Sequence, residues 1–185
     1  MSIAAIVLAA GSSRRFGEPK QLARLGHETL IERAVRLCRE AECMPIVVVL
    51  GASSETIQRH CNLEDTLIVI NNGWNEGMGS SLRIGVNALD SSVDGCVVVT
   101  CDMPAVSAEH LRKLMQRGEI TASEYAERRG VPAYFPASTF EALMQVHGDA
   151  GARDLLKKAD TVPLPGGELD VDTAQDLQHA RELFR

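Results

Sequence analysis

The chain contains 185 residues, of which 45% are hydrophobic and 24% charged, and its 19 basic against 25 acidic side chains give a formal net charge of −6. This length corresponds to about one domain, so we expect residues 1–185 to form a single one. The longest apolar runs, 3–10 and 45–50, are much shorter than the roughly 20 residues that cross a bilayer. The acidic balance and the few aromatic residues argue against nucleic-acid binding.

The five cysteines are odd in number and form no Cys-x-x-Cys pair, so they predict neither a disulfide framework nor a structural zinc site. The first residues also lack the charged-then-apolar order of a signal peptide. We therefore expect a cytoplasmic protein with reduced thiols, no membrane partner, and local cations wherever it binds an anion.

Four short apolar runs predict strands that are buried on both faces, because they lack the alternation of a half-exposed strand. They cover residues 3–8, 46–50, 66–70 and 95–100. Apolar residues spaced three and four apart predict helices between and after these runs. The first predicted helix covers residues 29–41, and the second carries Ile57 and Cys61 and can be capped by Ser53 or Ser54. A third predicted helix carries Leu82, Val86 and Leu89. The fourth carries Leu111, Leu114 and Met115 and is capped by Ser107. This alternation predicts an α/β fold with a mostly parallel sheet and helices on both faces.

The alternation loosens after Gly118. Residues 120–126 and 131–135 predict two strands around a charged turn at 127–130, a small antiparallel excursion from the parallel sheet. Further on, Thr173 and Asp176 have the spacing of a capping box. An apolar stripe of Leu177, Ala180 and Phe184 follows, so we expect a terminal helix.

The loop after the first strand, residues 9–22, combines small residues with cations. Ligands of open parallel sheets bind beyond the carboxyl ends of the strands. Gly11 lets the backbone approach a phosphate closely, while Arg15 and Lys20 supply positive charge. This pattern predicts a polyphosphate site, and it is favoured over the alternative that Gly11 only ends a strand before a solvated basic turn. For Arg14 alone we expect the solvated turn, because adjacent loop residues rarely face the same ligand.

Two other phosphate-binding motifs do not fit this loop. The dinucleotide fingerprint Gly-x-Gly-x-x-Gly fails because position 13 is Ser13, and the Walker motif fails because Gly17 is followed by Glu18 and Pro19. The sequence therefore indicates neither a Rossmann dehydrogenase nor a P-loop enzyme.

Asp102 directly follows the strand at 95–100, and Pro104 stiffens the turn, so its carboxylate is expected at the same edge of the sheet as Gly11. Mg²⁺ prefers one or two carboxylates together with phosphate oxygens and water. Asp172, in the loop before the terminal helix, is the natural second carboxylate. The alternatives are an ordinary turn acid for Asp102 and a helix N-cap for Asp172.

Residues 71–82 form a second candidate loop. Gly77 and Gly79 precede Ser80 and Ser81 at the start of a helix, so their backbone N–H groups and hydroxyls can contact a base or ribose. The alternatives are a flexible lid and, for Trp74, a packing role. No histidine is assigned to catalysis, and His110 and His147 are expected on helix surfaces.

The motif Leu8-Ala9-Ala10-Gly11-x-Ser13-x-Arg15-x-Gly17-x-x-Lys20-x-Leu22 resembles the opening motif of nucleotidyltransferases that join a nucleoside triphosphate to a phosphorylated acceptor. Its Ala-Ala-Gly form and the segments at 75–82, 102–104, 148–153 and 170–173 are similar to molybdenum cofactor cytidylyltransferases. The resemblance covers nearly the whole chain. It implies a three-layer α/β/α, Rossmann-like sandwich of the nucleotide-diphospho-sugar transferase type.

The resemblance also implies an activity: Mg²⁺-dependent transfer of CMP from CTP to the terminal phosphate of molybdopterin, with release of pyrophosphate. A transient contact with a molybdoenzyme or its chaperone would follow. Two alternatives stay open. One is a nucleotidyltransferase for a sugar phosphate or polyol phosphate, and the other is a non-catalytic accessory protein that delivers a cofactor to a molybdoenzyme.

Site roles follow from the residues and the resemblance together. Arg15, Lys20 and Asp102 are the expected catalytic residues, and Asp102 and Asp172 the expected metal ligands, with Asp170 as the alternative second ligand. The expected nucleotide-binding residues are Ala9, Ala10, Gly11, Ser12, Ser13, Arg15, Lys20, Asn75, Gly77, Gly79, Ser80 and Ser81.

The resemblance implies acceptor binding by Arg153 and Pro132. Two positions depart from the family pattern at this end of the chain. Val131 stands in a turn where a histidine is usual, and Cys101 stands where a glycine is common before the Asp-Met-Pro turn. These departures bear more on the acceptor than on the nucleotide.

Overall fold

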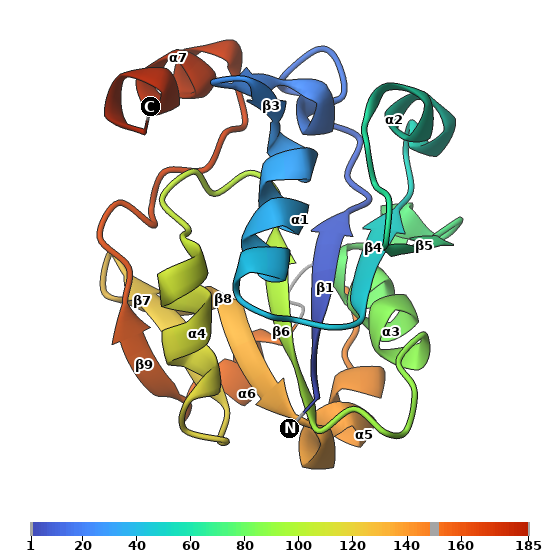
Figure 1. The fold of residues 1–185 in the computed structure, drawn as a ribbon, viewed down its shortest axis with the longest axis vertical. Helices are drawn as coiled ribbons and strands as arrows, with labels where there is room; N and C mark the ends of the chain where they lie inside the picture. The colour runs from blue at the N-terminus through green and yellow to red at the C-terminus, as the bar shows by residue number, and fades with distance from the viewer. Residues whose placement is uncertain (1, 149–151, 185) are drawn as a thin grey trace.

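The computed structural model describes residues 2–148 and 152–184 and has a seven-stranded sheet at its centre (Figure 1). The strand order is β5-β4-β1-β6-β8-β7-β9. The strands are β1 (Ile3–Ala9), β4 (Ile46–Leu50), β5 (Leu67–Ile70), β6 (Gly95–Thr100), β7 (Thr121–Tyr125), β8 (Arg128–Pro136) and β9 (Asp160–Pro163). Only β8 pairs antiparallel with its neighbours, so the sheet is mostly parallel with a small antiparallel excursion, as predicted.

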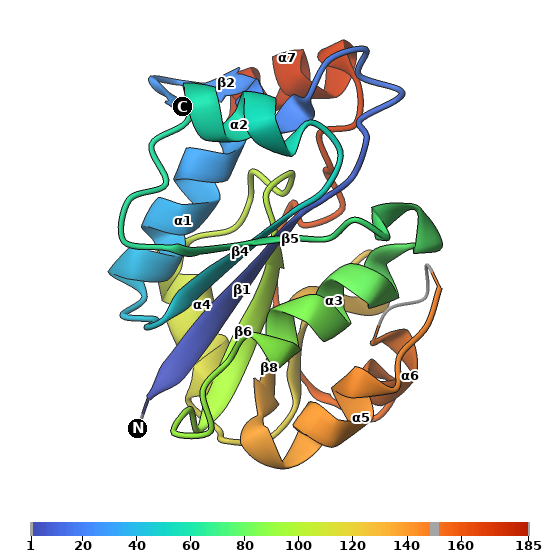
Figure 2. The same ribbon diagram turned by 90° about the vertical axis from the view of Figure 1, so that its right-hand side faces the viewer.

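Helices cover both faces of this sheet, which gives the predicted three layers. In Figure 2, α1 (Leu30–Glu40) and α4 (Ala108–Met115) lie on one side of the strands. On the other side lie α3 (Met78–Asn87), α5 (Phe140–Met144) and α6 (Arg153–Leu156). None of the described helices has the length and apolar character needed to span a membrane.

The carboxyl ends of the central strands carry further elements. They are α2 (Ser54–His60), α7 (Ala174–Leu183) and a separate antiparallel pair, β2 (Arg24–Leu25) and β3 (Glu28–Thr29), all at the top of Figure 1. The N-terminus lies at the opposite end of the sheet. Long connections from distant parts of the sequence therefore meet above β1 and β6.

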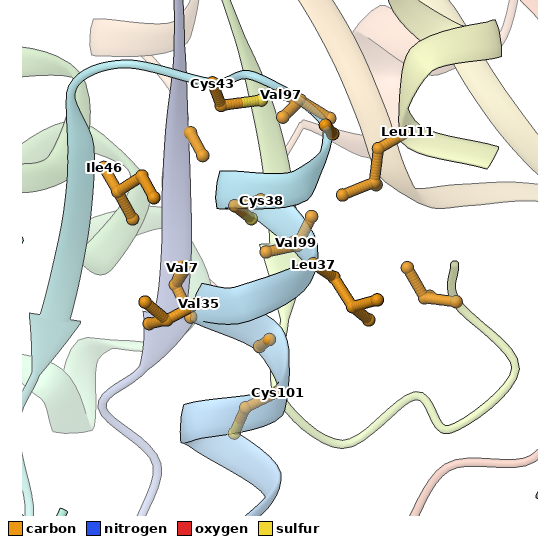
Figure 3. Close-up of a cluster of buried hydrophobic side chains, with 14 of the residues drawn as sticks. Val7, Val35, Leu37, Cys38, Cys43, Ile46, Val97, Val99, Cys101 and Leu111 are labelled. Atoms are coloured by element: carbon orange, nitrogen blue, oxygen red, sulfur yellow. The ribbon is translucent and has the colours of Figure 1, made fainter. Parts of the chain in front are cut away.

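Strand β1 is buried on both faces, as its unbroken apolar run predicts. Val7 and Ala9 belong to the apolar cluster under α1 and α4, part of which is drawn in Figure 3. Ile6 and Leu8 belong to the cluster under α3. Because both faces are filled, the strand has little freedom to shift, and it holds the loop that follows it in place.

Two of the three predicted helix caps are confirmed: the Ser107 side chain accepts a hydrogen bond from the His110 N–H, and Thr173 makes a complete capping box with Asp176. Thr29, which was not predicted as a cap, makes a second complete capping box with Glu32. At α2 the prediction of a serine cap is wrong. Ser53 takes a left-handed conformation with φ of 61°, and its side chain makes no capping hydrogen bond.

Two other local predictions differ from the structure. The turn between β7 and β8 contains only Ala126 and Glu127, because both have positive φ (45° and 56°), the conformation that closes a two-residue hairpin. The loop expected at residues 71–82 is also shorter than expected, since the chain forms a 3-10 turn at Trp74–Glu76 and α3 begins at Met78. Strands β2, β3 and β9 were not predicted, because each is too short or too polar to show a pattern.

His110 is buried, with 6% of its surface exposed, so the prediction of a helix-surface residue is wrong. Its Nε2 lies 2.7 Å from Ser123 Oγ, which donates a hydrogen bond to the carbonyl of Pro132. Burial lowers the pKa of His110 to about 4, with a smaller contribution from Lys113.

This burial predicts a loss of stability in acid. Protonation of His110 favours the unfolded chain, where the pKa is near its ordinary value of 6.5. Neutral His110 therefore contributes to the free energy of unfolding in full above pH 6.5, and this contribution is lost as pH falls toward 4. The loss is at most about 3 kcal/mol. Urea unfolding at pH 7 and pH 4.5 measures it. His110→Gln, which cannot titrate, should show a shallower decline, and an equal decline in both proteins would refute the prediction.

Candidate active site

Two adjoining cavities open at the carboxyl ends of β1 and β6. The first encloses about 520 Å³ and is lined by residues 8–15, Lys20, Gln21, part of the segment 74–81, residues 100–102 and Asp172. The second encloses about 500 Å³ and lies toward β7, β8 and α6. Leu8, Met78, Thr100 and Asp102 line both. A group bound in one cavity can therefore meet a group bound in the other beside Asp102.

The loop after β1 presents backbone donors in the first cavity. The N–H groups of residues 11–15 donate no hydrogen bond to any other part of the described chain. Ser13 has a φ of 53°, and its carbonyl accepts from the N–H groups of Phe16 and Gly17. Successive free N–H groups around such a left-handed residue form a concavity that suits an anion.

All predicted nucleotide-binding residues of this loop line the first cavity: Ala9, Ala10, Gly11, Ser12, Ser13, Arg15 and Lys20. Arg14 lines it too, although we expected a purely solvated side chain. The turn at residues 13–17 explains this, because it places the backbone of both Arg14 and Arg15 at the edge of the cavity.

Cations and carboxylates from three distant segments meet in this cavity. The Lys20 ammonium lies 2.6 Å from Asp102 Oδ2 and 2.7 Å from Asp172 Oδ1. Arg15 binds the other oxygen of Asp172 at 2.6 Å. Burial alone would lower the pKa of Lys20, but the charge of Asp102 and the hydrogen bonds to both carboxylates outweigh it and raise the pKa. Lys20 therefore stays charged at any ordinary pH.

A backbone contact holds the two acids together. The Val171 N–H donates to the Asp102 carbonyl at 2.8 Å, which ties the segment before α7 to the turn after β6. The Arg33 guanidinium secures the same turn from α1 by donating to the carbonyls of Pro104 and Val106. Asp172 does not cap α7, because Thr173 occupies that position. Its carboxylate is free to face the cavity.

The carboxylate pair suits a hard cation that is bound together with phosphate. Asp102 and Asp172 direct oxygens to one point, where the Lys20 ammonium lies in this structure. Within residues 2–148 and 152–184, no group of three or more His, Cys, Asp or Glu side chains forms a complete metal cage. Two carboxylates with open positions match the way Mg²⁺ is held at phosphate sites.

Asp170 lies apart from this ion-pair group and lines the second cavity. Burial, with the nearby charges of Asp102 and Asp172, raises the pKa of Asp170 to about 6. The carboxylate that shares Lys20 with Asp102 is Asp172.

The second loop reaches the first cavity only in part. Asn75, Gly77 and Ser81 line it, together with Trp74. Gly79 and Ser80 line neither cavity. The Gly79 N–H donates to the carbonyl of Gly148, and the Ser80 hydroxyl is bonded to Asn71 and Gly77, so neither is directed toward a ligand.

The second cavity has an apolar floor and a basic rim. Its floor includes Leu82, Val98, Phe135 and Leu156, and its rim carries Arg128, Arg129 and Arg153. Pro132 is buried within β8 and does not line this cavity, so the structure does not place it where an acceptor could touch it. Gly130 and Val131 line the cavity instead. Residues 149–151, at the centre of the 148–153 segment, lie outside the described residues.

Sequence reasoning missed Gln21 and Thr100. Gln21 is 1% exposed, and its side-chain amide donates hydrogen bonds to the carbonyls of Ala9 and Gly11. Thr100 lines both cavities. Gln21 adjoins Lys20 in the motif, but nothing local distinguishes it from a surface glutamine. Thr100 could have been found from its place at the end of a buried strand beside Asp102.

The fold and the site together define a nucleotidyltransferase of the nucleotide-diphospho-sugar transferase fold, which takes a nucleoside triphosphate. The chain belongs to the MobA-like NTP transferase domain family, whose model matches residues 5–162. The predicted nucleotidyltransferase family is thereby confirmed, and the sheet order and layers described above confirm the predicted fold class.

Individual relatives carry different activities. Nicotine blue oxidoreductase of Paenarthrobacter nicotinovorans is 30% identical over 195 residues, which cover 99% of this chain and 95% of that protein. A probable molybdenum cofactor guanylyltransferase of Opitutus terrae is 31% identical over 134 residues, or 68% of this chain and 62% of that protein. The crystal structure of Rv0371c from Mycobacterium tuberculosis is 28% identical, has a TM-score of 0.88 and covers 98% of both chains. A structure of Rv0371C in complex with manganese has a TM-score of 0.81, at 26% identity over 98% of this chain and 99% of that one.

Proposed function

We propose that residues 1–185 act as one Mg²⁺-dependent cytidylyltransferase domain that transfers CMP from CTP to the terminal phosphate of molybdopterin and releases pyrophosphate. The observation that carries the proposal is that two cavities meet at Asp102. One presents free N–H groups and cations suited to a triphosphate, and the other has the space and basic rim for a phosphorylated acceptor. The relation to a probable molybdenum cofactor guanylyltransferase supports the acceptor class.

The first cavity is assigned to the nucleotide. The N–H groups of residues 11–15 bind phosphate oxygens, and Arg15 and Lys20 neutralise charge on the triphosphate. Arg14 lines the same rim and makes no ion pair with the described residues, so it adds a further cation. Asn75, Gly77 and Ser81 face the base and ribose from the opposite wall.

The chemistry requires little covalent work from the protein. The acceptor phosphate is already ionised near pH 7, so it can attack the α-phosphorus without a general base, and pyrophosphate leaves in line. Asp102 and Asp172 would hold Mg²⁺, which supplies charge neutralisation on the phosphate oxygens. Lys20 then changes partner, from the two carboxylates to the phosphates. Positioning and charge neutralisation provide the rate enhancement.

The second cavity is assigned to the acceptor. Arg153, with Arg128 and Arg129, provides positive charge for the anionic groups of molybdopterin, while the apolar floor accepts its ring system. Val131, which replaces the usual histidine, adds to the apolar wall. A sugar phosphate or polyol phosphate offers no apolar surface to that floor, which is why molybdopterin is preferred.

Base selection should depend on Ala10, whose backbone lies on the wall of the first cavity. Its side chain lies close to Gly51, so a larger side chain would displace the loop or extend into the cavity. Ala10→Val should raise KM for CTP about tenfold and reduce the preference for CTP over GTP. Ala4→Val adds the same volume within β1, away from both cavities, and serves as the control. An unchanged CTP to GTP ratio in Ala10→Val would remove this residue from base recognition.

The experiment that tests the function is a matrix of CTP, GTP and ATP against molybdopterin, a sugar phosphate and a polyol phosphate, with pyrophosphate release as the readout. Release with CTP and molybdopterin alone supports the proposal. Release with another acceptor retains the transferase and replaces the acceptor. Nucleotide binding without release in any combination would favour the non-catalytic accessory protein.

A second candidate activity comes from the relative that acts as a nicotine blue oxidoreductase, because the similarity extends over 99% of this chain. The same two cavities would then hold a redox nucleotide and a dye-like aromatic compound on the apolar floor. Oxidation of a reduced nicotinamide nucleotide by nicotine blue, followed by absorbance, tests this activity. Dye turnover without pyrophosphate release from any acceptor would make the oxidoreductase the better assignment.

A further inference from the structure

Gln21 is the largest polar side chain buried beneath the first cavity. It is 1% exposed and belongs to the short 3-10 turn Lys20–Leu22, so it directly follows Lys20. Its Nε2 donates to the carbonyls of Ala9 at 2.8 Å and Gly11 at 3.1 Å. Its Oε1 accepts from the Ser13 hydroxyl at 3.2 Å.

These bonds determine which way the peptide groups of the loop face. The carbonyls of Ala9 and Gly11 point down to the amide of Gln21 rather than into the cavity, where their partial negative charge would repel phosphate. The N–H groups of residues 11–15 are left without a partner in the described chain. The loop is therefore held in the orientation that an anion needs before the anion binds.

The same network reaches the catalytic lysine. The Ser13 hydroxyl accepts from the Lys20 backbone N–H at 3.1 Å while donating to Gln21. The loop that offers N–H donors and the turn that carries the Lys20 ammonium are thus joined through one buried amide. A glutamate would place a carboxylate against two carbonyls, and an apolar side chain would remove the Gln21 donor from both carbonyls.

We propose that Gln21 is a positioning residue that orients the loop after β1 for the triphosphate and thereby sets nucleotide affinity. This inference rests on the proposed nucleotide site, and it concerns a side chain that is 1% exposed and acts through its hydrogen bonds to the loop. Replacement of Gln21 should weaken binding of the triphosphate and of pyrophosphate. Binding of the acceptor should stay unchanged, because Gln21 does not line the second cavity.

The test uses Gln21→Met and Gln21→Glu in the full chain. Trp74, the single tryptophan, lines the first cavity, so its fluorescence reports binding of CTP and of inorganic pyrophosphate. Both variants should raise the Kd of both ligands about tenfold or more. In turnover assays KM for CTP should rise by the same factor, with a smaller change in kcat and in KM for the acceptor. Ser13→Ala removes the hydroxyl between Gln21 and the Lys20 backbone but keeps the Gln21 bonds to Ala9 and Gly11, so it should shift the Kd in the same direction by less. It replaces either variant that fails to fold.

Leu114→Ala is the matched control, because Leu114 is fully buried in the core under α4 and lines neither cavity. It should lower Tm without changing the Kd of CTP. Kd values within twofold of the wild type in the Gln21 variants, or an equal rise in Leu114→Ala, would overturn the inference. A wild-type protein that binds neither CTP nor pyrophosphate would overturn the nucleotide site itself, and with it this role, whereas normal wild-type binding with unaffected variants refutes only the role of Gln21.

Discussion

Asp102→Asn should lower kcat about a thousandfold or more while leaving the fold intact. Asp102 lies where the two cavities meet, and its carboxylate is one of two that converge on the position proposed for Mg²⁺. An amide keeps the shape of the side chain but removes the negative charge that would hold the cation beside the phosphates. Steady-state pyrophosphate release measures the loss, and circular dichroism with thermal unfolding shows that the variant is folded.

Two comparisons make this result specific to the position. Asp160→Asn changes an acid on β9 that pairs with Arg117, outside both cavities, and should retain normal turnover. Asp172→Asn should also lose activity, because it removes the second carboxylate. Near-normal turnover in folded Asp102→Asn would exclude this residue from the reaction.

Lys20→Met should abolish turnover and at the same time tighten the binding of a divalent ion to the nucleotide-free protein. The ammonium lies 2.6 and 2.7 Å from the same two carboxylates that would hold the metal, so it competes with the ion for them. When the ammonium is removed, two nearby acids remain without their shared cation, and this favours a metal. We expect the affinity for Mn²⁺, measured from the electron paramagnetic resonance signal of the free ion, to rise about tenfold.

Arg15→Met is the matched variant for this experiment. It removes a cation from Asp172, but the Arg15 side chain is 74% exposed, so solvent screens its contribution and the Mn²⁺ affinity should change much less. Turnover by Lys20→Met comparable with the wild type would contradict the catalytic role of Lys20. An unchanged Mn²⁺ affinity would show instead that the metal does not use the carboxylates bound to Lys20.

Local sequence signals were sufficient for most of the fold. Unbroken apolar runs predicted β1, β4 and β6, and apolar residues spaced three and four apart predicted α1 and α4. Both patterns can be read within a few residues of sequence. The two complete capping boxes are equally local, since Thr29 and Thr173 satisfy donors only three residues away. The short strands β2, β3 and β9 are different, because pairing with a distant partner, and not their own composition, makes them strands.

The candidate site divides in the same way. The first loop could be recognised from its sequence, because a glycine and closely spaced cations indicate an anion-binding site within a few residues of chain. Gly79, Ser80 and Pro132 were assigned by pattern and resemblance, and tertiary contacts direct each of them away from the cavities.

The sequence by itself determined the alternation of strands and helices, the phosphate-type loop and the acids that accompany it, because each depends on neighbours along the chain. Only the tertiary structure decided that Lys20 lies between Asp102 and Asp172, that Gln21 supports the loop from beneath, and that two cavities share a wall. These features depend on the pairing of β1 with β6 and on the hydrogen bond from the Val171 N–H to the Asp102 carbonyl. Both interactions join residues far apart in the sequence, so no local sequence pattern predicts them.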